Sequence, residues 1–108
     1  MPHEVKVTIN TSGSTHSITV DPEELRIPAG DRQPIQWKIQ NPAQEGWKFR
    51  NKGIDIENPG TEFDHPTGGG NRIFTWNNNH TKSGRYKYWV RVESGGVNVD
   101  HDPTILNN

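Results

Sequence analysis

The chain has 108 residues, the size of one compact domain, so residues 1–108 are expected to fold as a single unit. It carries 12 basic and 13 acidic residues, a formal net charge of -1, so no overall field attracts nucleic acid or an anionic membrane surface. Cysteine is absent, which excludes disulfides, thiolate metal sites and cysteine nucleophiles.

Apolar and polar residues alternate along most of the chain. In chain order, the alternating segments are 5–9, 16–20, 25–27, 35–39, 47–49, 54–56, 72–76, 85–92, 97–99 and 104–106. In the fourth of these, Ile35, Trp37 and Ile39 share one face. This period, with β-branched and aromatic residues on one face, is typical of half-buried strands. Leu, Ile, Val and Phe together number only 21 of the 108 residues, so the predicted core is small.

Glycine and proline fall between these segments, where turns need them. The stretches SGST, PAGD, PTGGGN and NNNHTKSG read as turns or polar loops. One helical turn is conceivable at DPEEL, with Asp21 as its cap, and it competes with a strand that begins at Leu25. About eight short strands separated by turns predict an all-β, antiparallel sandwich or barrel whose sheets each face water on one side.

Three segments together resemble the cupredoxin family: ELRIPAGDRQPIQWKIQN (24–41), GRYKYWV (84–90) and TILNN (104–108). The resemblance implies a cupredoxin-like, immunoglobulin-like Greek-key β-sandwich. By the family pattern the copper-binding cysteine falls near Val90, the first histidine falls where Trp47 and Lys48 stand, and the only methionine is Met1. A blue-copper centre needs a thiolate and two imidazoles, so we expect no copper site and no cofactor. DPEEL and HDPTI also resemble the DP-EP family of bacterial proteins, which implies a similar sandwich and no known activity.

The alternation in GRYKYWVRVE directs Trp89 outward, between Lys87 and Arg91 on the same face. An exposed indole between two cations can stack on a ligand or on a partner's side chain. The same three residues can equally form a closed unit, in which the two cations cover the ring. Both interpretations stay open at this point.

Two aspartate–histidine clusters suggest a metal site as an alternative. Asp64 precedes His65, and His101 lies between Asp100 and Asp102. If they converge, they offer ligands for a divalent ion. Aspartate beside histidine or proline is also ordinary loop chemistry.

No motif for nucleophilic catalysis or phosphate binding is present, so we do not expect an enzyme. The function predicted from the sequence is a non-catalytic interaction or structural module, with a divalent-metal-binding protein as the alternative. The expected partner is a protein or a small ligand, without nucleic acid or membrane, and the expected state is a monomer or a weak homodimer formed by edge-strand pairing. If Met1 is the native start, a cytoplasmic location is expected; otherwise the compartment stays open.

Overall fold

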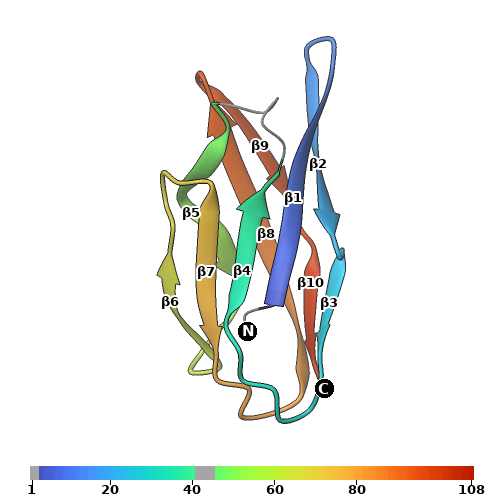
Figure 1. The fold of residues 1–108 in the computed structure, drawn as a ribbon, viewed down its shortest axis with the longest axis vertical. Coiled ribbons are helices and arrows are strands. Elements are labelled where there is room, and N and C mark those ends of the chain that lie inside the picture. Colours follow the sequence, from blue (N-terminus) through green and yellow to red (C-terminus); the bar gives the residue numbers. More distant parts are fainter. Residues whose placement is uncertain (1–2, 41–45) are drawn as a thin grey trace.

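A computed structural model describes residues 3–40 and 46–108. Ten strands form two five-stranded sheets, which confirms the all-β sandwich, and the described residues contain no helix (Figure 1). The first sheet has the order β2 (Thr15–Asp21), β1 (His3–Ser12), β4 (Ile35–Ile39), β7 (Ile73–Asn78) and β6 (Phe63–Thr67). The second has the order β3 (Glu24–Ile27), β10 (Thr104–Asn107), β8 (Gly84–Ser94) and β5 (Lys48–Ile56), with β9 (Val97–His101) also paired to β8.

The sheets differ from the sequence prediction in two respects. Strand β1 runs parallel to β4, and β10 runs parallel to β3, so both sheets are mixed rather than purely antiparallel. The segment DPEEL contains no helical turn: Asp21 ends β2, and β3 begins at Glu24. The strand prevails there because Leu25 and Ile27 must both point into the core, which an extended backbone allows.

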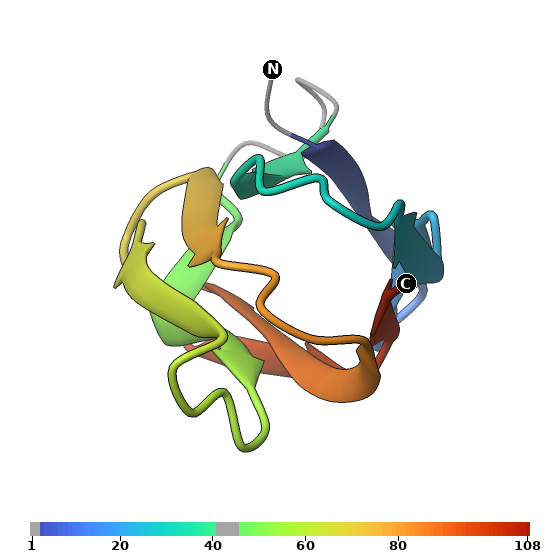
Figure 2. The same cartoon turned by 90° about the horizontal axis from the view of Figure 1, so that it is seen from below.

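The core lies between the sheets and follows the predicted alternation. Val5, Val7 and Ile9 of β1 are buried, as are Trp37 of β4 and Tyr88 of β8. Seen along the long axis of the molecule, the two sheets face each other across the interior (Figure 2). The indole Nε1–H of Trp37 donates to the hydroxyl of Tyr88 at 3.0 Å, which joins the sheets through the middle of the core. Burial raises the pKa of the Tyr88 hydroxyl, so it stays protonated and keeps this contact.

Strand β8 is the centre of the second sheet. Its first half pairs with β10 and its second half with β9, and the chain passes from β9 to β10 at Pro103. Proline has no N–H, so a break in the ladder at this residue costs no backbone donor. On its other side β8 pairs with β5, which is bulged between Phe49 and Ile54. The outer edges of the sheets are β2 and β6 in the first and β3, β5 and β9 in the second, so edge-strand pairing between copies would use one of these five.

Candidate binding face

The alternation of β8 places Trp89 on the outer face of the second sheet, as predicted. Tyr88 and Val90 are fully buried, so the residue between them must point away from the core. The Lys87 ammonium lies 6.0 Å from the centre of the half-buried indole, and the Arg91 guanidinium carbon lies 5.7 Å from it. The three residues singled out from the sequence therefore form one contact unit, the Trp89 cluster.

The neighbouring strands supply a carboxylate for each polar group of this cluster. Arg91 pairs with Asp55 of β5 at 2.8 Å, and Lys87 pairs with Asp102 at 2.9 Å. The indole N–H of Trp89 points at Glu57, with 3.3 Å between nitrogen and oxygen. The hydrogen bond with Asp102 raises the pKa of Lys87 and lowers that of Asp102. The ring is thus held from three sides, and its two cations are compensated.

A shallow depression of about 420 Å³ continues the Trp89 cluster toward the edge of the sheet. It is lined by Arg50, Asn51, Lys52, Arg91 and Glu93, three cations against one carboxylate. Arg50 is paired with Asp100 at 3.3 Å. Lys52 has no carboxylate partner among the described residues, so its charge is free for a ligand or partner.

The residues of the alternative metal site do not come together. Asp64 and His65 lie on β6 in the first sheet and contact each other at 2.7 Å, and hydrogen bonds from Asn79 and His65 lower the pKa of Asp64. His101 lies on β9, in the second sheet, and is bonded to Glu23 at 2.8 Å. Both aspartates beside His101 are engaged with cations: Asp100 with Arg50 and Asp102 with Lys87. Within residues 3–40 and 46–108, no group of three or more His, Asp or Glu side chains is arranged to hold a metal ion.

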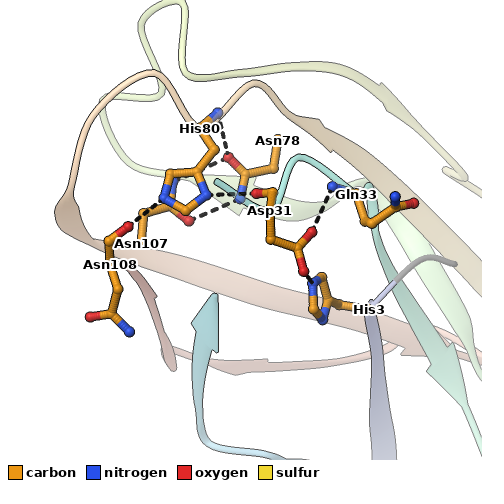
Figure 3. Close-up of polar contacts among 7 residues, drawn as sticks. All are labelled: His3, Asp31, Gln33, Asn78, His80, Asn107 and Asn108. Atoms are coloured by element: carbon orange, nitrogen blue, oxygen red, sulfur yellow. Dashed lines mark hydrogen bonds and ion pairs between the residues drawn. The ribbon is translucent and has the colours of Figure 1, made fainter. Parts of the chain in front are cut away.

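One end of the sandwich is closed by buried polar side chains that the sequence did not reveal (Figure 3). Asn78 ends β7 in the first sheet, and Asn107 ends β10 in the second. Their amides bond each other reciprocally: Asn78 Nδ2 donates to Asn107 Oδ1 at 2.9 Å, and Asn107 Nδ2 donates to Asn78 Oδ1 at 3.1 Å. The N–H of His80 donates to the same Asn78 oxygen at 3.1 Å. This polar end cluster therefore links the two sheets away from the apolar core.

The imidazole of His80 extends the polar end cluster to two further segments. Its Nδ1 lies 2.6 Å from the main-chain oxygen of Asp31, and its Nε2 lies 2.7 Å from a main-chain oxygen of Asn108. These oxygens only accept hydrogen bonds, so the ring donates to each of them through a nitrogen that carries a proton. The Asp31 carboxylate accepts from the N–H of Gln33, which lowers the pKa of this carboxyl, and His3 at 2.9 Å adds to the effect. The sequence NNNHTKSG gave no sign of this cluster, because runs of polar residues indicate exposed loops.

The chain matches no protein-family model, and no curated protein is similar to it in sequence. In the described part of the chain, no helix has the length and apolar character needed to cross a membrane.

Proposed function

We propose that the protein is a non-catalytic interaction module that binds a partner protein through the Trp89 cluster and the adjoining depression. The observation that supports this most is the fixed, half-buried indole of Trp89, held between Lys87 at 6.0 Å and Arg91 at 5.7 Å. Tryptophan and arginine are the residues most often responsible for binding energy at interfaces. A ring already held by its neighbours loses little conformational freedom when a partner covers it.

The charges around the ring favour a particular kind of partner. Lys87 and Arg91 are neutralised within the protein, whereas Lys52, in the adjoining depression, has no carboxylate partner in the described part of the chain. A fitting partner presents an apolar or aromatic side chain to Trp89 and a carboxylate to Lys52. Such a charge at the rim of an interface mainly increases the rate of association and selects the partner.

Affinity capture with variants tests this function. The immobilised protein is compared with Trp89→Ala and Lys52→Glu, and Lys38→Ala, an exposed lysine on the opposite sheet, is the matched control. A partner retained by the parent and the control is then purified and titrated. We expect Trp89→Ala to weaken binding by about tenfold or more, as for an interface anchor. If every retained protein binds the parent, Trp89→Ala and Lys52→Glu equally well, this face is not the binding site.

We also propose that the chain is a copper-free relative of the cupredoxins. What supports this is Val90, which is fully buried in β8 where the family pattern places the copper cysteine. Its side chain has no lone pair to offer a metal, and the chain contains no cysteine to replace it. We expect no intense blue absorption when Cu(II) is added, because that band comes from charge transfer between a thiolate and the copper ion. An intense band would contradict the proposal.

A further inference from the structure

A second candidate site lies on the side of the sandwich where β5 faces β6 and β7. A hollow of about 440 Å³ opens there, between the edges of the two sheets. Small-molecule sites usually measure ~300–1,000 Å³. Its inner wall is apolar and aromatic and its rim is polar. The buried side chains Ile54, Phe74 and Trp76 lie inside, and Asn51, Lys52, Asp55 and Thr67 lie at the rim.

The strands that flank the hollow are bulged where they line it. The pairing of β5 with β8 shifts between Phe49 and Ile54, and the pairing of β6 with β7 shifts between Asp64 and Thr67. Bulges bend a strand and interrupt its ladder, and they are common beside binding sites. Here they interrupt the ladders of the two edge strands that border the hollow, while Trp76 on its inner wall stays buried, at 7% exposure.

Main-chain hydrogen bonds hold the hollow in shape. The loop after β6 is fixed to β5 by two of them: Gly70 N–H donates to Phe49 O, and Phe49 N–H donates to Asn71 O, both at 2.8 Å. The indole N–H of Trp76 donates to the carbonyl of Ile54 at 2.8 Å, which fixes the inner wall. The loop packs so closely that a Cβ on Gly69 would lie 2.9 Å from the carbonyl oxygen of Asn51. The hollow is therefore preformed, and a ligand entering it would not have to order the loop.

The rim combines hydrogen-bond donors and acceptors without a net charge. Lys52 contributes one cation and Asp55 one carboxylate, of which Oδ2 is used by Arg91 and Oδ1 stays available. The side-chain amide of Asn51 has no hydrogen-bond partner among the described residues. The hydroxyl of Thr67 makes only a long contact, 3.3 Å, to a main-chain oxygen. A wholly apolar ligand would leave these polar groups without partners.

We propose that this hollow binds a neutral saccharide. A sugar ring has hydroxyl groups that both donate and accept around its edge, which matches the amide of Asn51, the free oxygen of Asp55 and the hydroxyl of Thr67. It also has an apolar C–H face, which can contact the small accessible parts of Trp76 (7% exposed) and Phe74 (2% exposed) on the inner wall. The inner wall of the hollow lies between the sheets, whereas Trp89 lies on the outer face; the two sites share Asn51, Lys52 and Asp55 at their rims.

Indole N–H signals in ¹H–¹⁵N NMR spectra test this proposal. The protein is titrated with glucose, galactose, N-acetylglucosamine, maltose and cellobiose, and with inorganic phosphate and adenosine as ligands of other classes. We expect at least one sugar to shift the Trp76 Nε1–H and the Gly69 amide and to leave the Trp89 Nε1–H in place. This readout keeps the two proposals distinguishable, because a partner on the outer face would move the Trp89 signal instead.

Two variants sharpen the test. Asn51→Ala removes one rim group and should weaken binding about fivefold, the usual effect of one lost hydrogen bond, whereas Asn98→Ala, an exposed asparagine on β9, should leave it unchanged. Thr67→Trp places a bulky ring at the mouth and should abolish the shifts. The proposal is overturned if none of the sugars moves the Trp76 signal at high millimolar concentration. It is also overturned if only phosphate or adenosine does so, or if Thr67→Trp binds like the parent.

Discussion

The amide pair of Asn78 and Asn107 gives a sharp test of how the two sheets are held together. Asn78 is 2% exposed and Asn107 is 0% exposed, so water cannot replace a hydrogen bond that either amide loses. Replacing Asn78 by leucine, which has nearly the same shape, removes both reciprocal bonds and the acceptor for the His80 N–H. The Asn107 amide then stays buried away from water but no longer has the hydrogen bonds that compensated for its burial.

The size of the loss follows from the number of groups left without a partner. Three buried groups lose their bonds: the oxygen and the nitrogen of the Asn107 side chain, and the N–H of His80. Each such group costs ~1–3 kcal/mol, so Asn78→Leu should lower the free energy of unfolding by about 3–9 kcal/mol. A domain of this size has only ~5–15 kcal/mol in total. In the double variant Asn78→Leu/Asn107→Leu, only the His80 N–H stays unpaired, so the double variant should be more stable than Asn78→Leu alone.

Urea denaturation followed by circular dichroism measures all three proteins, and an unchanged dependence on urea would show that the unfolding reaction stays the same. The exposed Asn98→Leu is the control, with an expected change below about 0.5 kcal/mol. In a double-mutant cycle, the two substitutions should be strongly non-additive. If the double variant instead loses the sum of the two single losses, the amides do not depend on each other and the reasoning fails.

Three further predictions concern the core, the facing of β8 and acid stability. Trp89→Ala should lower the free energy of unfolding by less than about 1 kcal/mol, because it removes a half-buried surface ring, whereas Trp37→Ala removes a fully buried ring and should lower it by about 3–5 kcal/mol. If chemical denaturation gives the reverse order, the assigned facing of the strand is wrong. Val90→Asp should unfold the protein, because it buries a carboxylate without a partner, whereas Val90→Cys should lower the free energy of unfolding by about 1 kcal/mol. If Val90→Asp and the parent melt at the same temperature, residue 90 is exposed. Burial by itself raises the pKa of Glu62, but hydrogen bonds from Thr81 and the next N–H outweigh it, so the net pKa lies below its usual 4.5. The stabilisation by Glu62 is therefore complete above about pH 4.5 and disappears as the pH falls through the lowered value, and Glu62→Gln, which cannot ionise, should flatten that part of the stability curve.

The facing of the strands could be predicted from the sequence because it is a local property. Successive side chains of a strand point to opposite sides, so one buried residue fixes its neighbours. Val90 between Trp89 and Arg91 was sufficient to place the Trp89 cluster outside, and the structure puts it there. The contacts of Arg91 with Asp55 and of Lys87 with Asp102 could not be predicted, because the sequence of β8 does not determine which strands lie beside it.

The parallel pairs and the polar end cluster escaped prediction for a related reason. The pairing of β1 with β4 depends on where the intervening strands go, and the alternation of each strand fits either direction. Asn78 and His80 stand in a run of polar residues, which locally favours an exposed loop. They are buried only because Asn107, far away in the sequence, and two main-chain oxygens meet them there. The polarity of an isolated segment predicts that its side chains bond to water, but other parts of the fold can supply the same hydrogen bonds and allow these side chains to be buried.

The polar end cluster also bears on how a protein with so few apolar residues can keep the two proposed binding surfaces rigid. A buried amide pair stabilises only one arrangement of the two sheets, because sliding one sheet by a residue would separate Asn78 from Asn107 and leave both unsatisfied. In the described residues every buried side-chain nitrogen and oxygen has a hydrogen-bond partner, so the cost of such a displacement applies at each polar contact inside the sandwich. The Trp37–Tyr88 bond in the core and the Trp76–Ile54 bond beside the hollow restrict the sheets in the same manner. A scaffold fixed in this way keeps both the outer indole and the hollow in one geometry, which would lower the conformational cost of binding at either proposed site.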